Sequence, residues 1–274
     1  MTLFEPEPPA APEGPLVRVR LLIAYAGGGF RGFAVQAGVR TVAGELAKAM
    51  ERVVRHRVQI TCAGRTDAGV HAWGQVVHVD VRPPVDLDGL QRACTKMLGP
   101  EIVVRSAELA ADGFDARRSA TERRYRYTIL NTPVPNPFLA ATTWHVDAPL
   151  DLRAMALACD PLYGEHDFSS FCRKPPAPDA SLVRIVRHAG WQDTGEGQLR
   201  FEVAASSFCQ QMVRALVGTM VDVGLGRKRA GDMAWMLRSR DRSKAGQLAP
   251  PHGLCLWEVT YNDLSSTLHS FAPQ

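Results

Sequence analysis

The sequence has six cysteines, but no two of them are close enough to form a metal-binding or redox-active pair. They stand at positions 62, 94, 159, 172, 209 and 255, so the nearest two are thirteen residues apart. A zinc knuckle or a Cys-x-x-Cys redox motif needs two cysteines separated by only a few residues. We therefore expect no metal site and no redox centre, and we expect reduced thiols.

Long apolar runs are missing as well. No run approaches the roughly eighteen residues that a membrane-crossing helix needs. The first fifteen residues, MTLFEPEPPAAPEGP, contain five prolines and three glutamates and lack the basic start and apolar centre of a signal peptide. Because this composition cannot build a core, we expect a disordered tail over residues 1–15. With neither a signal peptide nor a membrane-crossing run in the sequence, we expect a cytoplasmic protein.

Lysine is scarce, since 27 of the 32 basic residues are arginine and only 5 are lysine. Arginine is preferred for bidentate phosphate contacts and for stacking on bases, although a GC-rich genome produces the same excess. The net charge of +4 is too small to indicate a nucleic-acid partner by itself. With 46% hydrophobic and 22% charged residues, the chain is expected to be globular.

The order of predicted elements repeats along the chain. Periodicity and capping residues predict, in the first half, strand 17–25, a helix after Thr41, strands 58–63 and 75–81, helix 87–98 and strand 102–110. In the second half they predict strand 124–130, helix 152–162, strands 183–191 and 199–205, helices 209–225 and 231–239, and strand 254–261. Each half is thus predicted to follow the order β-α-β-β-α-β.

This repetition predicts an α+β fold of two ferredoxin-like or RRM-like halves. The first half spans residues 16–115, the second spans residues 116–265, and a short tail follows at 266–274. We expect their largely antiparallel sheets to join side by side, with the helices packed on one face. A central cleft between the halves is the expected functional site.

The stretch CAGRTDAGVHAWGQVVHVDV, residues 62–81, places a carboxylate in a glycine-rich loop between two apolar strands. An isolated Asp-x-Gly is usually a turn in which the aspartate bonds its own backbone. Here Arg65 precedes Asp67 by two residues and is placed to keep the carboxylate ionised. Ala68 and Gly69 leave room for the backbone of a ligand to approach. Asp67 is therefore a candidate catalytic residue.

The stretch ERRYRYTILN, residues 122–131, alternates aromatic and basic side chains. Alternation along a strand places Tyr125 and Tyr127 on one face, and Arg124 and Arg126 on the other. The pattern is typical of an ordinary surface strand, but it also suits extruded bases, which stack on rings while phosphates meet arginine.

Arg214 is the basic residue within the apolar helix predicted over 209–225, on a stripe with Gln210, Gly218 and Val221. A guanidinium in a packed helix needs an anionic partner, because an unpaired buried charge is costly. Asp67 and a substrate phosphate are both candidates for that partner.

Two further groups of residues favour ordinary structural roles. His71 and His78 have no companion ligands at metal spacing, which favours structural histidines. The basic cluster RVVRHR contains Arg52, Arg55 and Arg57 and is typical of a solvated surface. These arginines would contact phosphates only if they lie along the cleft.

Together these segments resemble the TruA family of tRNA pseudouridine synthases, over about residues 18–262. The similar segments are AGRTDAGVHAWGQVVHVD (63–80), FDARRSATERRYRYTILN (114–131), SSFCQQMVRALVGTMVDVG (206–224) and APPHGLCLWEVTY (249–261). The chain departs from the family pattern Tyr-Asp-Gly and Gly-Trp-Gln-x-Gln, because it has Ala26, Phe33 and Ala34 at the aspartate, the tryptophan and the first glutamine. The departure bears on RNA contacts by this loop and not on the chemistry.

The resemblance implies the pseudouridine synthase fold and the isomerisation of uridine at positions 38, 39 and 40 of the tRNA anticodon stem-loop. It implies no cofactor and no metal, because nothing is oxidised or reduced and no group is carried. It also implies a homodimer, with one tRNA bound across both subunits.

The resemblance also implies roles for individual residues. Asp67 is expected to attack C1′ as a nucleophile or to remove the C2′ proton as a base, with Arg65 and Arg214 as the cations beside it. Tyr125 is expected to stack on the base or to help remove the C5 proton. The remaining residues expected to contact substrate or RNA are Gly64, Gly69, His71, Arg52, Arg55, Arg57, Arg124 and Arg126.

Two other classes of function remain open from the residues. The chain could be a non-catalytic RNA-binding protein with two RRM-like halves, although the RRM aromatic signature is missing. It could instead be a hydrolase that uses Asp67 and His71 as acid and base. These two residues are four positions apart in a glycine-rich loop, and no oxyanion donor is evident.

Overall fold

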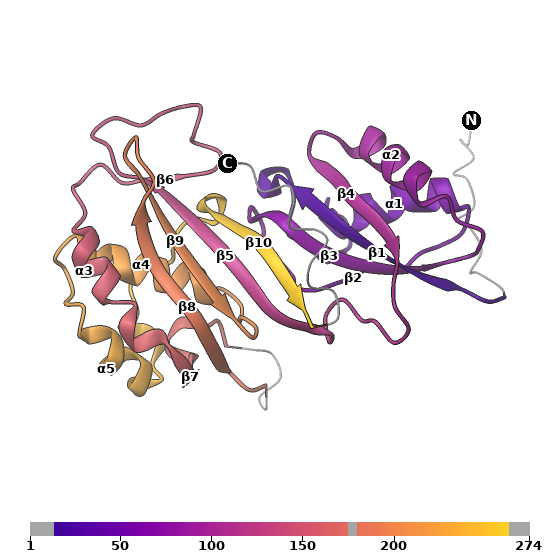
Figure 1. The fold of residues 1–274 in the computed structure, drawn as a ribbon. Helices are drawn as coiled ribbons and strands as arrows, with labels where there is room; N and C mark the ends of the chain where they lie inside the picture. Colours follow the sequence, from indigo (N-terminus) through magenta and orange to yellow (C-terminus); the bar gives the residue numbers. More distant parts are fainter. Residues whose placement is uncertain (1–13, 175–179, 263–274) are drawn as a thin grey trace.

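The structure, a computed structural model, describes residues 14–174 and 180–262. These residues form one ten-stranded sheet in the order β4-β1-β3-β10-β5-β9-β8-β7, with β2 paired to β3 and β6 paired to β5 (Figure 1). The strands are β1 (Val17–Tyr25), β2 (Thr61–Cys62), β3 (His71–Val81), β4 (Ile102–Leu109), β5 (Ala120–Leu130), β6 (Trp144–His145), β7 (Gly164–Asp167), β8 (Val183–Asp193), β9 (Gln198–Ala205) and β10 (Leu254–Tyr261). The α-helices are α1 (Val42–Val54), α2 (Leu87–Leu98), α3 (Leu152–Leu157), α4 (Met212–Gly224) and α5 (Asp232–Ser239).

The first half of the chain contributes β4, β1 and β3 to one end of the sheet, with α1 and α2 beside them (Figure 1). β1 pairs antiparallel with both β3 and β4. The side chain of Thr41 caps α1 by accepting a hydrogen bond from the N–H of Gly44, and α1 ends at Arg55 in the left-handed conformation. Asp86 caps α2 through Gly89 in the same way. These caps set where each helix begins.

The second half contributes an antiparallel set of strands, β5, β9, β8 and β7, with α3, α4 and α5 packed around it (Figure 1). α4 is the most deeply placed helix, since 11 of its 13 residues are buried and only Arg214 and Asp222 are not. One apolar core runs through both halves.

The two halves meet where β10 lies parallel to β3. Only two residue pairs make this contact, Cys255 with His71 and Leu256 with Ala72. β10 also pairs antiparallel with β5 over most of its length. The last predicted strand is therefore the one that joins the two halves.

The α+β class with a large, mostly antiparallel sheet is confirmed, and most predicted elements lie within a few residues of their expected bounds. The single helix predicted over 152–162 is wrong: it divides into α3 and a 3-10 turn at Asp160–Leu162, because Pro161 lacks the N–H that a continuing helix needs. The strand predicted over 58–63 shortens to β2. The sequence does not predict β6 and β7, since strands of two and four residues are too short to show alternation.

The expected tails lie almost wholly outside the described residues, which begin at residue 14 and end at residue 262. The boundary expected after residue 115 falls in the connection between β4 and β5. Within the described part of the chain, no helix has the length and apolar character that crossing a membrane requires.

Candidate active site

An open cleft contains the aspartate loop that the sequence singles out. Its walls come from segments 31–36 and 58–68 of the first half and from segments 180–182 and 206–214 of the second half. Tyr125 and Arg123 of β5 also line it. The cleft therefore draws on both halves of the chain, as expected for a site between them.

Buried polar side chains fix the loop before Asp67. Gln75 is 0% exposed; its Nε2 donates to the carbonyl oxygen of Gly64 at 2.6 Å, and its Oε1 accepts from the N–H of Gly64 at 3.4 Å. The hydroxyls of Tyr25 and Thr66 share a hydrogen bond of 2.8 Å, and the N–H of Phe33 donates to the carbonyl oxygen of Thr66 at 3.0 Å. The loop backbone is thus held at Gly64 and at Thr66, on either side of the exposed Arg65.

Asp67 starts a turn that directs its carboxylate towards α4. The N–H of Val70 donates to the Asp67 carbonyl oxygen at 3.1 Å, and Gly69 takes a φ of +79° that favours glycine. Oδ2 of Asp67 lies 3.9 Å from a terminal nitrogen of Arg214, and Oδ1 accepts a long hydrogen bond of 3.5 Å from Gln210. The carboxylate is therefore half-buried between two side chains of the second half.

Arg214 is held in place independently of Asp67. Its side chain is 12% exposed, and its Nε donates to the carbonyl oxygen of Ala249 at 2.7 Å. Burial lowers the pKa of Arg214, while the nearby Asp67 carboxylate acts in the opposite direction. Of the two anionic partners expected for this guanidinium, the structure places Asp67 beside it.

Arg65 lies elsewhere than expected. Its side chain is exposed and lines the cleft, and among the described residues it forms no ion pair with Asp67. The turn at Asp67 explains this, because it points the carboxylate at α4 and away from the preceding residues. The cation beside Asp67 is Arg214, and a role for Arg65 in catalysis stays a prediction.

Tyr125 forms part of the cleft wall next to the aspartate loop. The residue is 7% exposed, and its ring meets the ring of Phe208 edge to face at a centroid distance of 5.0 Å. A Cβ on Gly64 would lie 3.8 Å from the Tyr125 hydroxyl, which shows how close the loop and the ring are. Burial raises the pKa of Tyr125 well above its usual value, so the hydroxyl stays protonated at neutral pH.

Gly69 and His71 lie outside the cleft lining, whereas Gly64 lies within it. Nδ1 of His71 accepts a hydrogen bond from the N–H of Gly27 at 3.1 Å, and Nε2 lies 3.1 Å from the carbonyl oxygen of Ala141. With Nδ1 accepting, Nε2 carries the proton and donates. Burial lowers the pKa of His71. These contacts give His71 a structural role, and a contact with substrate stays a prediction.

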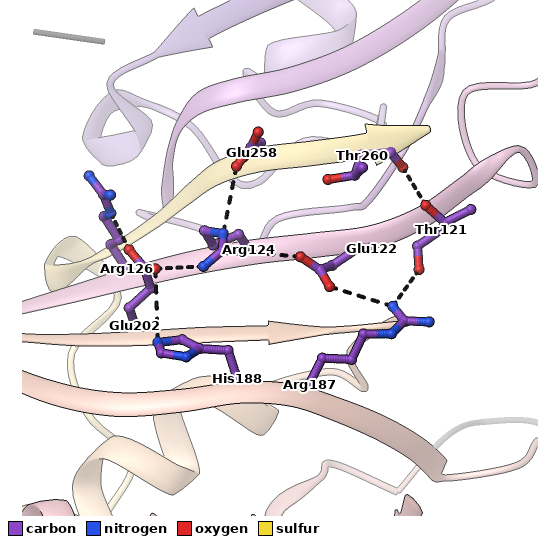
Figure 2. Close-up of polar contacts among 9 residues, drawn as sticks. All are labelled: Thr121, Glu122, Arg124, Arg126, Arg187, His188, Glu202, Glu258 and Thr260. Carbon is purple, nitrogen blue, oxygen red and sulfur yellow. Dashed lines mark hydrogen bonds and ion pairs between the residues drawn. The ribbon is translucent and has the colours of Figure 1, made fainter. Parts of the chain in front are cut away.

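Arg124 and Arg126 project from the face of β5 opposite to Tyr125, where carboxylates surround them (Figure 2). Glu202 accepts from Arg124 at 2.6 Å and from Arg126 at 2.7 Å, and Glu122 lies 3.3 Å from Arg124. In these contacts the carboxylates neutralise the positive charges of the two arginines. Because phosphates would compete with these carboxylates, the structure offers no support for the RNA contacts predicted at these two arginines.

Arg52, Arg55 and Arg57 are exposed at the end of α1 and do not belong to the cleft lining. The arginines that do line the cleft, besides Arg65 and Arg214, are Arg31, Arg117, Arg123, Arg173 and Arg184. Asp67 is the only acidic residue in the lining that the structure describes. Sequence patterns do not reveal this cationic cleft, because its arginines come from well-separated segments.

Four further side chains of the site were missed by the sequence analysis. These residues are Gln75, Tyr25, Phe208 and Arg123. Gln75 and Arg123 bond main-chain atoms, Tyr25 bonds the Thr66 hydroxyl, and Phe208 packs against the Tyr125 ring. Only Gln75 leaves a signal in the sequence, as an amide at the head of the apolar run QVVHVDV. A buried amide must find hydrogen-bond partners, which marks it as part of a fixed network.

This arrangement suits nucleophilic or basic chemistry by a single carboxylate. Arg214 places a positive charge 3.9 Å from the Asp67 carboxylate. The hydrolase that pairs Asp67 with His71 is not supported, since both ring nitrogens of His71 are engaged outside the cleft. The alternative of a non-catalytic RNA-binding module gives no reason for a carboxylate among arginines that could contact phosphates.

Comparisons with known proteins agree with the geometry. A family model described as tRNA pseudouridine synthase matches residues 158–262. The tRNA pseudouridine synthase A of Bacillus velezensis is 39% identical over 249 residues, covering 90% of this chain and 100% of that protein. The namesake protein of Bacillus subtilis is 38% identical over 250 residues with the same coverage, and that of Frankia casuarinae is 44% identical over 248 residues, covering 90% of each chain. The chain therefore belongs to the tRNA pseudouridine synthase A family.

Proposed function

We propose that the protein isomerises uridine to pseudouridine at positions 38, 39 and 40 of the tRNA anticodon stem-loop, with Asp67 as the nucleophile and without a cofactor. The observation that carries the proposal is the placement of Asp67 beside Arg214, as the single carboxylate among the described lining of a cationic cleft. An anionic RNA would be drawn to the cleft arginines and would bring its ribose to this carboxylate.

The proposed reaction begins when Asp67 attacks C1′ and the N1–C1′ bond breaks, which leaves a ribosyl ester and a free uracil anion. The base turns over, C5 attacks C1′, and the carboxylate departs again. The C5 proton is then lost and N1 carries a proton, so the product is an isomer of the substrate. Arg214 stabilises the carboxylate each time it is free, which favours its departure.

The target base must leave its stack to reach Asp67. Tyr125 offers the freed base an aromatic surface at the cleft wall, fixed by its edge-to-face contact with Phe208. The backbone of Gly64, next to the Tyr125 hydroxyl, leaves room for the ribose. These residues would keep the base in place while it is detached from its sugar.

We also propose that two copies of the chain bind one tRNA between them, in the cytoplasm where tRNA is found. This proposal is supported by the family membership shown above. It does not follow from the residues of the cleft.

The test is release of tritium from C5 of uridine, using an anticodon stem-loop that carries one labelled uridine at position 38, 39 or 40. We expect wild-type protein to release tritium to water without added cofactor, whereas a binding protein or a hydrolase would not. Asp67→Asn keeps the shape and removes the charge, and we expect it to lose activity by a factor of roughly a thousand or more. Asp112→Asn is the matched control, since Asp112 is exposed and lies outside the cleft.

Turnover by Asp67→Asn close to that of Asp112→Asn would contradict the role of Asp67. The choice of site would be contradicted if these stem-loops released no tritium while a tRNA labelled at a uridine outside the three positions did. Deuterium at C2′ distinguishes the nucleophile from the base, because only removal of the C2′ proton gives a primary isotope effect.

A further inference from the structure

Arg123 is a buried arginine at the base of the cleft. It lies two residues before Tyr125 on the same face of β5 and is 8% exposed. Burial lowers the pKa of its guanidinium. A buried cation is costly unless its donors are satisfied, so the partners of this side chain show what it is there to hold.

The partners of Arg123 are four main-chain carbonyl oxygens. One terminal nitrogen donates to Ala63 at 2.9 Å and to Arg117 at 2.7 Å. The other donates to Ala120 at 2.9 Å and to Ser206 at 2.8 Å. One rigid, planar group therefore joins three separate segments of the chain. Lysine cannot do the same, because its single nitrogen has three donors and no fork.

Two of these segments carry the reactive side chains. Ala63 immediately precedes the loop that ends in Asp67, and Ser206 begins the segment that leads into α4 with Gln210 and Arg214. The sheet itself joins the two halves through only the two residue pairs between β3 and β10. The guanidinium of Arg123 is thus a direct link between the two halves next to the reacting carboxylate.

We propose that Arg123 is a positioning residue that sets the distance between Asp67 and Arg214. It holds the loop and the start of α4 to one rigid group, and it does not touch the reacting atoms. The proposal rests on the proposed role of Asp67. Because the two side chains lie 3.9 Å apart, a shift of either segment by 1 Å would change both their interaction and the approach to C1′.

The experiment compares Arg123→Lys with Arg20→Lys. Arg20 is a matched control because it is 6% exposed, pairs with Glu108 at 2.9 Å and lies outside the cleft. We expect both variants to unfold at lower denaturant concentration. Only Arg123→Lys should slow the isomerisation measured in single turnover at saturating protein, by about 10- to 100-fold. That first-order rate constant does not depend on the folded fraction, so a loss of stability alone leaves it unchanged.

A coupling measurement separates positioning from general damage. In the background of Arg214→Ala, we expect Arg123→Lys to slow the reaction much less than it does alone, because the geometry that it protects is already lost. A wild-type rate constant for Arg123→Lys, or losses that multiply fully in the double variant, would overturn the proposal. If Arg123→Lys does not fold, Arg123→Gln is measured at lower temperature under the same criteria.

The same assays include Asp67→Asn. If Asp67→Asn retains turnover, the proposed function of Asp67 fails whatever Arg123 does. If Asp67→Asn is inactive while Arg123→Lys reacts like wild type, only the positioning role fails.

Discussion

Tyr125 shows how the environment of one side chain selects among its possible roles. Burial raises the pKa of its hydroxyl, which disfavours the phenolate that removal of the C5 proton would require. A neutral ring offers a stacking surface, which its fixed contact with Phe208 holds in one orientation. We therefore expect Tyr125 to stack on the freed base rather than to remove the C5 proton.

We expect Tyr125→Phe to keep most of the affinity for tRNA, because the ring remains, and Tyr125→Leu to lose turnover more severely. Loss of one stacked base costs about 1–3 kcal/mol. The measurements are equilibrium binding and single-turnover rates, with Tyr163→Leu as a control at an exposed tyrosine outside the cleft. Turnover by both Tyr125 variants at the wild-type rate would reduce Tyr125 to a residue of the strand.

A contact can be predicted from the sequence where the chemistry of a residue itself requires a partner. A basic residue in an apolar helix needs an anion, and Asp67 is indeed the carboxylate beside Arg214. Arg65 was expected to be the cation beside Asp67, but the structure places Arg214 there. The sequence cannot predict this, because the direction in which a turn points its side chains depends on tertiary contacts. Arg123 was not recognised, since its partners are carbonyl oxygens that every residue has.

At the scale of elements, α4 and the segment 246–250 hold each other. The N–H of Gly246 donates to the Thr219 hydroxyl at 2.8 Å, and the N–H of Ala249 donates to the carbonyl oxygen of Arg214 at 3.2 Å. A Cβ on Gly218 would lie 1.8 Å from the carbonyl oxygen of Gln247. Glycine is therefore needed here for close approach of two backbones, and this approach brings Ala249 to the guanidinium of Arg214.

We expect Gly218→Ala to push this segment away from α4, to destabilise the protein by about 1–3 kcal/mol and to lower turnover through Arg214. Denaturant unfolding and single-turnover rates measure the two effects. Gly231→Ala is the matched control, since a Cβ there would meet no atom within 4 Å and its φ of −63° suits alanine. An unchanged unfolding midpoint for Gly218→Ala would contradict the close packing.

The sequence also predicts which side of α4 matters. Within α4, Arg214 faces Asp67 and Gly218 faces the segment 246–250, whereas Gln210 lies before the first residue of α4 and reaches Asp67 from there. The spacing of Arg214 and Gly218 in the sequence is enough to place them on one side of a helix. The end of α3 before Pro161 and the two-residue strand β6 are not predicted in this way, because they depend on local chemistry and on pairing across the sheet.

At the scale of the whole molecule, two groups of arginines differ in the partners around them. Those on the open face of β5 and β8 have carboxylate partners, as Figure 2 shows for Arg124, Arg126 and Arg187. Those in the cleft share a lining in which Asp67 is the only described acidic residue. The small net charge of the chain gives no indication that paired arginines and cleft arginines lie on different parts of the surface.

We expect tRNA affinity to fall steeply with salt, and substitution of Arg31, Arg117 or Arg173 by alanine to reduce the slope of log affinity against log salt by roughly one unit per lost contact. Arg187→Ala is the control and should leave the slope unchanged, because Arg187 lies outside the cleft near Glu122. Equal slopes for wild-type protein and every cleft variant would contradict a phosphate path along the cleft.

The same titration tests the contacts that the sequence predicts at Arg52, Arg55 and Arg57. These residues are exposed at the end of α1, beyond the cleft lining. A reduced slope for their alanine variants would show that the RNA extends over that helix.

The central position of β10 has a consequence for the order in which the molecule can be assembled. β10 is the last described strand along the chain, yet it lies between β3 and β5 in the middle of the sheet. During synthesis the first half can form most of its own strand pairings early, but strand pairing cannot join its sheet to that of the second half until residues 254–261 have left the ribosome. A chain that stops before this strand would have two sheets with no strand pairing between them, and we expect the cleft, whose walls come from both halves, to be complete only after this closing step of folding.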